Sequence, residues 1–277
     1  MTDISATAVK SLRDRTGLPL MECKRALQET SGDEDLAVER LRKSGKKTME
    51  QRAARETAFG RLGLYANIAE GVGALIELRC ESAPVAANDE FRQLSVDLAR
   101  QLATGPGAAG PDELLSQPSP SDPAKTLADQ KDELSNRIRE VFNLTRILRI
   151  DGPCGGYIHH DGIKGALIQI EGDDAEMAKQ IGMHVVAIPD TEALHIDDLN
   201  PDLVAKEREI LSEAARLEGK PENIIEKMVD GRMRNFYAER VLMEQPFVID
   251  EKKTVGKAAK EAGVTINRYV RWEIGAE

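Results

Sequence analysis

Two twelve-residue stretches decide the fold: YANIAEGVGALI, from Tyr65 to Ile76, and YIHHDGIKGALI, from Tyr157 to Ile168. Each ends in Gly-Ala-Leu-Ile, which begins eight residues after the tyrosine, and each carries a glycine between the tyrosine and that ending. Short apolar runs joined by a glycine-containing turn are typical of a β-hairpin. Because the same spacing occurs twice, we expect an internal repeat of two related hairpins.

Each hairpin is followed by a segment whose apolar residues recur at helical spacing. They are Phe91, Leu94, Leu98 and Leu102 after the first hairpin, and Ala175, Ala178, Ile181 and Val185 after the second. An apolar residue at every third or fourth position predicts a helix with one buried face. The repeat therefore predicts an α+β core of two related halves, each an antiparallel hairpin sheet plus helices, over residues 60–144 and 145–200.

Three short amphipathic segments precede this core. Gly17 predicts the end of the first helix, Pro19 the first turn of the second, and Gly45 the end of the third. Three helices in so short a segment bury little surface alone. We therefore predict a small three-helix module over residues 1–45, joined to the core by a basic helical linker over residues 46–59.

The segment between the two halves predicts a loop, a helix and a strand. Thr104 to Ala124 is rich in glycine and proline, which favours a surface loop. Leu127 to Leu144 has the composition of a charged helix. Residues 146–150 alternate between polar and apolar side chains, as a strand does.

The last third of the chain predicts a helical hairpin and a small module. Residues 201–240 hold two amphipathic stretches joined at Gly219-Lys220-Pro221, and so short a connection favours antiparallel packing. Such an arm has little else to bury against, so we expect it to protrude. Residues 241–277 are expected to return to the core as a short C-terminal module, with a helix over 254–262 and a strand over 266–274.

The composition is that of an acidic chain. Of 277 residues, 41% are hydrophobic and 31% are charged, and the formal net charge is -10. Such a chain can form a core but suits no specific nucleic-acid binding, which needs clustered Lys and Arg. One basic run, from Arg40 to Arg61, is the exception. A solvated helix face is the simpler interpretation of that run, and a contact with RNA or an acidic partner is the alternative.

The cysteines and apolar runs indicate a compartment. Cys23, Cys80 and Cys154 are too few and too scattered for a disulfide framework or a paired-cysteine metal site. That usage is typical of a reducing compartment. No apolar run reaches membrane-spanning length, and the N-terminus has no signal-peptide core. We therefore expect a cytoplasmic protein without a membrane contact.

The sequence carries no recognisable catalytic or nucleotide-binding motif. Gly162-Ile163-Lys164-Gly165 lacks the spacing of a phosphate-binding loop and fits the turn of the second hairpin. Cys154, His159, His160 and Asp161 lie close together, but no second ligand pair completes a tetrahedral metal site, so a polar turn is the simpler interpretation. We expect no direct nucleotide binding, no metal, no cofactor and no catalytic residue, which favours an interaction protein over an enzyme.

Two further features allow more than one interpretation. His184 stands alone on an apolar helix, where a buried, hydrogen-bonded histidine is the commoner situation. Leu20 and Met21 could belong to the core of the N-terminal module, or could point outward as a hydrophobic contact patch. Spacing alone decides neither question.

Several motifs, in order along nearly the whole chain, resemble the elongation factor Ts family. VKSLRDRTG, from Val9 to Gly17, and MECKRAL, from Met21 to Leu27, resemble its N-terminal module. Gly219-Lys220-Pro221 and Gly231-Arg232-Met233 resemble its coiled-coil arm, and Gln245-Pro246-Phe247-Val248 resembles its C-terminal module. The motifs are highly specific together, although no single one is.

The resemblance implies a ubiquitin-associated-like N-terminal module and an antiparallel coiled-coil arm. It also implies a function as the guanine nucleotide exchange factor of elongation factor Tu in translation elongation, which binds that GTPase in its GDP-bound and nucleotide-free states. The family's N-terminal contact surface matches Arg13, Leu20 and Met21 here. His184 matches a core contact residue near the partner's nucleotide-binding loop.

One stretch departs from the family pattern. The family usually carries Cys-x-Thr-Asp-Phe-Val after the first hairpin, and its Asp-Phe pair inserts near the partner's magnesium site. Here the stretch is Cys80-Glu81-Ser82-Ala83-Pro84-Val85. Ala83 and Pro84 supply neither a carboxylate nor an aromatic ring. We expect the segment from Glu81 to Val85 to contact the partner, with Glu81 as a substitute carboxylate or with exchange relying on His184.

Two rival functions use only part of the chain. One is an adaptor that binds a ubiquitin-like protein or the ribosome through the N-terminal module alone. The other is a metal-dependent enzyme that uses Cys154 and His159. The order of family motifs along nearly the whole chain disfavours both.

Overall fold

The computed structural model describes residues 4–52, 54–219 and 221–275. The chain forms two compact units. The first takes the chain up to Gly63, Ile76–Leu148 and the end of the chain from Ile274, and the second takes Leu64–Leu75 and Arg149–Glu273. Across the described ranges, no helix combines the length and the apolarity that crossing a membrane requires.

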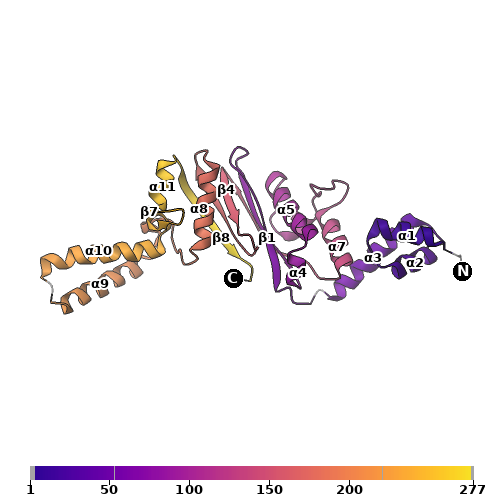
Figure 1. The fold of residues 1–277 in the computed structure, drawn as a ribbon, viewed down its shortest axis with the longest axis horizontal. Helices are drawn as coiled ribbons and strands as arrows, with labels where there is room; N and C mark the ends of the chain where they lie inside the picture. The colour runs from indigo at the N-terminus through magenta and orange to yellow at the C-terminus, as the bar shows by residue number, and fades with distance from the viewer. Residues whose placement is uncertain (1–3, 53, 220, 276–277) are drawn as a thin grey trace. The chain divides into compact units, whose positions relative to one another are not determined.

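Three helices form the start of the first unit, as predicted (Figure 1). They are α1 (Ala6–Thr16), α2 (Leu20–Glu29) and α3 (Glu34–Arg52). Their inward-facing residues form one small core of Val9, Leu12, Leu18, Cys23, Ala26, Leu27, Ala37 and Leu41. Gly17 ends α1 with a φ of 68°, a left-handed conformation that glycine adopts without strain.

The predicted end of the third helix at Gly45 is wrong, because α3 continues to Arg52. A Cβ atom at position 45 would lie 2.4 Å from Nδ2 of Asn136. Asn136 belongs to α7 (Leu127–Ile138) of the same unit. Gly45 therefore allows two helices to approach closely rather than ending one of them. Of the predicted linker, Ala53 lies outside the described residues.

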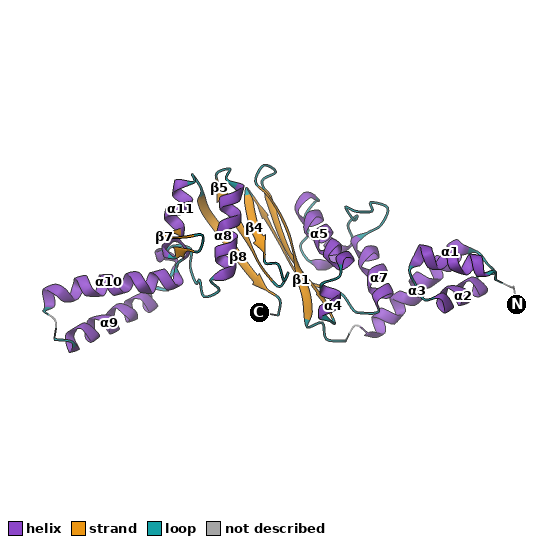
Figure 2. Ribbon diagram, viewed as in Figure 1, coloured by secondary structure: helices purple, strands orange, loops and turns teal. Residues whose placement is uncertain are grey.

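The repeat is confirmed in the two larger sheets (Figure 2). One has the strand order β1-β2-β3 and the other β4-β5-β8, so the second strand of each hairpin is central and a later strand completes each sheet. A helix follows each hairpin. The elements are β1 (Phe59–Asn67), β2 (Val72–Cys80), α4 (Ala83–Ala86), α5 (Asp89–Thr104), β3 (Asn143–Asp151), β4 (Cys154–Ile158), β5 (Lys164–Glu171), α8 (Ala175–Ala187) and β8 (Thr265–Glu273).

The helix predicted over residues 127–144 is shorter than expected. It ends at Ile138, where Arg139 takes a φ of 74° and its N–H donates to the carbonyl of Ser135. The chain then enters β3 at Asn143. Arg139 ends the helix in the left-handed conformation that glycine usually adopts at this position. Because no glycine marks the end of the helix, the composition did not indicate it.

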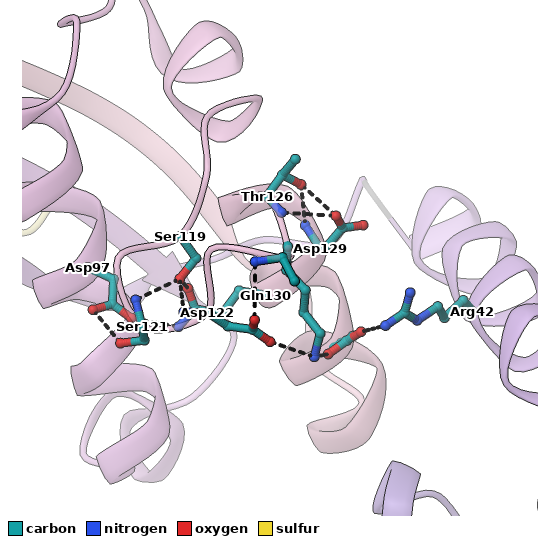
Figure 3. A network of polar contacts seen from close by, with 11 residues as sticks. Arg42, Asp97, Ser119, Ser121, Asp122, Thr126, Asp129 and Gln130 are labelled. Carbon is teal, nitrogen blue, oxygen red and sulfur yellow. Dashed lines mark hydrogen bonds and ion pairs between the residues drawn. The ribbon is translucent and has the colours of Figure 1, made fainter.

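The segment predicted as a surface loop is anchored in the first unit. It contains α6 (Pro111–Leu115), in which Leu114 is fully buried. Figure 3 shows the polar network behind it: the buried Asp97 carboxylate accepts from Ser121 Oγ and Gln130 Nε2, both at 2.8 Å. Ser119 Oγ donates to Gln130 Oε1, also at 2.8 Å. Because the Asp97 carboxylate and the Ser119 hydroxyl are buried and hydrogen-bonded, the loop is held in one place.

The helical hairpin of the second unit is confirmed. Helices α9 (Pro201–Leu217) and α10 (Glu222–Arg240) share a core, and their antiparallel course brings Arg208 to Asp230 and Glu218 to Arg232. Lys220, in the predicted turn, lies outside the described residues. The protruding coiled-coil arm stays a prediction, as does the ubiquitin-associated-like character of the first module.

The C-terminal region confirms the predicted helix and strand. Beyond α10 the chain forms η2 (Leu242–Glu244), β6 (Pro246–Phe247), β7 (Asp250–Thr254) and α11 (Val255–Glu261) before β8. A short 3-10 turn, η1 (Ile196–Asp198), precedes α9. Strand β8 pairs antiparallel with β5, with Leu167 opposite Val270. The end of the chain thus completes the sheet of the second hairpin.

Replacing Leu114 by alanine tests the anchored loop. Because Leu114 is fully buried, Leu114→Ala should lower the free energy of unfolding by about 2–5 kcal/mol, measured by denaturant titration. The matched control is Leu217→Ala, at a side chain that is 90% exposed, which should change it by less than about 0.5 kcal/mol. Equal, small effects for both variants would contradict the anchored loop.

Candidate partner-binding site

Helix α2 presents two apolar side chains to solvent. Leu20 is 46% exposed and Met21 68%, whereas Cys23, Ala26 and Leu27 on the other side of the helix are buried. Exposed large apolar side chains side by side on a small module are typical of a contact surface. Of the two interpretations that the sequence left open, the outward-facing patch is therefore the one observed.

Arg13 lies in the last turn of α1, in the same module, and its side chain is exposed. Its backbone carbonyl accepts from the N–H of Gly17, which ends the helix. An exposed cation in the same module as an apolar patch suits recognition of a partner with acidic and apolar groups.

The segment from Glu81 to Val85 leads into α4, and the two residues that differ from the family pattern are its most exposed ones. Ala83 and Pro84 are exposed, and Val85 is partly buried. The carboxylate of Glu81 is engaged within the protein: it accepts from the N–H of Val141 at 2.8 Å and pairs with Arg55 at 3.2 Å. The Glu81 carboxylate is therefore bound within the protein, where it stabilises the conformation of this loop.

Ser82 is held in the same way. Its N–H and its hydroxyl both donate to the Glu140 carboxylate, at 3.1 and 2.5 Å. Although Ser82 is the N-cap residue of α4, its side chain makes no capping hydrogen bond to that helix. The start of α4 is thus fixed by a side chain from outside the helix.

His184 lies on α8 and is completely buried. Its Nδ1 accepts from the N–H of Val248 at 3.3 Å, so Nε2 carries the proton and donates to Gln245 Oε1 at 2.8 Å. Burial lowers the pKa of His184, and the hydrogen bond to Gln245 opposes this shift. The two hydrogen bonds of the neutral ring therefore hold the segment from Gln245 to Val248 in place.

Sequence reasoning missed an apolar pair of side chains next to the backbone that His184 holds. Val248 and Ile249 are 38% and 48% exposed, directly after the backbone N–H that His184 holds. The uninterrupted apolar run Phe247-Val248-Ile249 before Asp250 is the signal that could have found them. The surface near His184 is thus formed by its neighbours, while its own ring lies beneath them.

Of the residues considered for a metal site, His159 and Asp161 meet, but in the described part of the chain they do not form a set of three ligands. Cys154 is buried in β4, and burial raises the pKa of its thiol to about 11, so it is a protonated, poor metal ligand. His159 Nδ1 lies 2.8 Å from Asp161 Oδ2 at the hairpin turn. Throughout the ranges that the structure describes, no group of three His, Cys, Asp or Glu side chains could hold a metal ion.

Four cations of the basic run from Arg40 to Arg61 pair with carboxylates. Arg42 pairs with Glu133, and Arg55 with Glu81. Arg40 and Lys43 likewise pair with glutamates close by in the module. Cations already neutralised within the protein attract phosphates less strongly, which favours the interpretation as a solvated helix face.

Comparison with known proteins gives one consistent result. The family model described as Elongation factor TS matches residues 81–276. The Elongation factor Ts of Saccharopolyspora erythraea is 40% identical over 280 residues, which cover 99% of each chain. That of Mycobacterium tuberculosis is 40% identical with the same coverage. That of Methylococcus capsulatus is 38% identical over 277 residues, 98% of this chain and 92% of the relative.

The buried histidine makes stability depend on pH. Because the pKa of His184 is lowered in the folded chain, the unfolded chain, with a pKa of 6.5, binds the proton more tightly. The contribution of His184 to the free energy of unfolding is fully present above about pH 6.5. As the pH falls below 6.5, the free energy of unfolding decreases by at most about 1.4 kcal/mol per pH unit, until the pKa of His184 in the folded chain is reached.

Denaturant titration between pH 5 and 8 measures this effect. In His184→Gln, the loss of stability between pH 6.5 and 5 should be smaller than in the wild type. The matched control is His160→Gln at an exposed turn position, which should keep the wild-type profile. A His184→Gln profile parallel to that of the wild type would contradict the assignment.

Proposed function

Since this chain belongs to the elongation factor Ts family, we propose that it is the guanine nucleotide exchange factor of elongation factor Tu in translation elongation. The observation that carries the proposal is the 40% identity to proteins named Elongation factor Ts over 99% of the chain. The order of modules supports it, since motifs that resemble the family lie in the three-helix module, the helical hairpin and the C-terminal module. In this proposal the chain performs no bond chemistry of its own.

The physical basis of such exchange is thermodynamic linkage. GDP is held in a GTPase by backbone N–H groups of the phosphate loop and by a magnesium ion. A protein that binds the nucleotide-free form more tightly than the GDP form must weaken GDP binding by the same free energy. Couplings of about 1–3 kcal/mol are typical of allosteric pairs. The factor therefore needs one surface for binding and another that acts on the nucleotide site.

We assign the binding role to the N-terminal module. Leu20 and Met21 offer exposed apolar surface, and Arg13 adds a cation. Apolar anchors that become fully desolvated contribute most of the energy in many interfaces. The Arg13, Leu20 and Met21 surface would thus hold the GTPase whether or not GDP is bound.

We assign the action on the nucleotide site to the region from Glu81 to Val85 and to His184. Ala83 and Pro84 provide no carboxylate and no aromatic ring, and Glu81 is engaged with Val141 and Arg55. The proposal therefore relies on shape at Ala83 and Pro84 rather than on charge. His184 would act through the segment from Gln245 to Val248, because its ring is buried.

Release of fluorescent GDP from elongation factor Tu tests the proposal. Labelled GDP is chased with excess unlabelled GDP, with this protein present at substoichiometric amounts. We expect fast, catalytic release, with each molecule of the factor serving many molecules of the GTPase. Binding without acceleration, or no binding, would contradict the proposed function.

A charged substitution on α2 tests the binding surface. Met21→Asp should weaken the complex with elongation factor Tu by about 30-fold or more, which corresponds to about 2 kcal/mol, because a carboxylate would be buried in an apolar contact. The affinity can be measured by titration calorimetry with the nucleotide-free GTPase. Leu217→Asp, at an exposed position of α9, is the matched control and should leave the affinity within about twofold. Equal affinities for both variants would remove Met21 from the interface.

A further inference from the structure

We infer that Arg139, Glu140 and Val141, in the connection between α7 and β3, form a junction that acts as a positioning element and sets two partner-contact surfaces relative to each other. The surfaces are Leu20 with Met21 on α2 and Ala83 with Pro84 on α4, and their role as contacts rests on the proposed function. All of these residues belong to the first unit. Each of the three junction residues bonds to a segment that carries one of the surfaces.

Arg139 holds the N-terminal module. Its guanidinium donates to the carboxylate of Glu22, the residue next to Met21. Its backbone carbonyl accepts from Nη1 of Arg52, at the end of α3, at 3.1 Å. One residue therefore contacts both α2 and α3. Together with the close approach of α3 and α7 at Gly45, these contacts orient the whole module.

The backbone of Arg139 adds an independent observation. Its φ is 74°, in the left-handed region that favours glycine or asparagine at the end of a helix. Arginine is an unusual residue for this conformation. Its presence here is explained by the side chain, since glycine would suit the backbone but could not reach Glu22.

Glu140 and Val141 hold the second surface. The Glu140 carboxylate accepts from both the N–H and the hydroxyl of Ser82, and the N–H of Val141 donates to Glu81. Ser82 immediately precedes Ala83 and Pro84. Because the Ser82 hydroxyl bonds to Glu140 and not to α4, the start of that helix is tied to the junction.

Two contact surfaces bind one partner more tightly when their separation is already set. A loose connection would leave each surface intact but would require ordering upon binding. The Arg139 and Glu22 side chains are 37% and 40% exposed, and ion pairs this exposed add little to folding stability. Loss of the pair should therefore change the orientation of the module far more than the stability of the fold.

The variant Arg139→Gly tests this inference, because it keeps the left-handed backbone and removes only the side chain. In the GDP-release assay, the concentration of factor at half-maximal acceleration should rise by about 3–10-fold, while the maximal rate and the melting temperature stay unchanged. A half-maximal concentration within twofold of wild type would overturn the inference. So would a melting temperature that falls in step with activity, because that would indicate a purely structural role.

A charge exchange supplies the matched control. Arg139→Glu alone places two carboxylates together and should impair exchange more than Arg139→Gly does. Combining it with Glu22→Arg restores an opposite pair and should recover at least half of the loss. Absence of any recovery would contradict the pairing of Arg139 with Glu22 as the basis of the effect.

A distance measurement separates this inference from the proposed function. Spin labels at Lys10→Cys on α1 and Arg100→Cys on α5 report the orientation of the module within the first unit, and the native cysteines are buried. The distance distribution should be broader in Arg139→Gly than in the parent protein. Equal widths would overturn the inference. A parent protein that fails to release GDP would contradict only the proposed function, because the distances are read without the partner.

Discussion

One steric constraint is common to both sheets. The helix that follows each hairpin packs so close to the hairpin's first strand that only glycine fits at the point of contact. A Cβ at Gly63 would lie 2.2 Å from the carbonyl oxygen of Ser95 on α5. A Cβ at Gly155 would lie 2.4 Å from the Cβ of Ala178 on α8. Both glycines stand two residues before the tyrosine of their repeat, so the repeat conserves a packing distance as well as a hairpin. A side chain at either glycine would therefore push the helix away from its hairpin.

The sequence was informative wherever a single local rule decided the structure. The matching eight-residue offsets predicted both hairpins, Gly17 predicted the end of α1, and apolar periodicity predicted α9 and α10. In these places the local backbone preference and the burial of apolar surface favour the same structure, which is the condition for reliable inference. The family resemblance then added a function that no periodicity could supply.

The errors have a different physical origin. Gly45 and Arg139 exchange their expected roles: the glycine lies inside a helix, because Asn136 approaches it, and the arginine ends one. The segment around Leu114 and Ser119 was predicted to be a surface loop because it is rich in glycine and proline, yet it covers the buried carboxylate of Asp97. Each of these features depends on a residue distant in sequence. A pattern read along one chain cannot contain that information.

At the candidate site, too, local patterns predicted the helices but not the contacts of individual side chains. Periodicity could not decide whether Met21 faces in or out, and it could place His184 on a helix without showing that both ring nitrogens are engaged. The apolar side chains beneath Leu20 and Met21 are buried, while the ion pair of Arg139 with Glu22 is partly exposed and weak. Such a division suits the proposed function, in which the chain binds its partner, weakens GDP binding and then dissociates. In this proposal the core keeps each surface intact, and weak contacts set the geometry between the surfaces without making the complex too stable to dissociate.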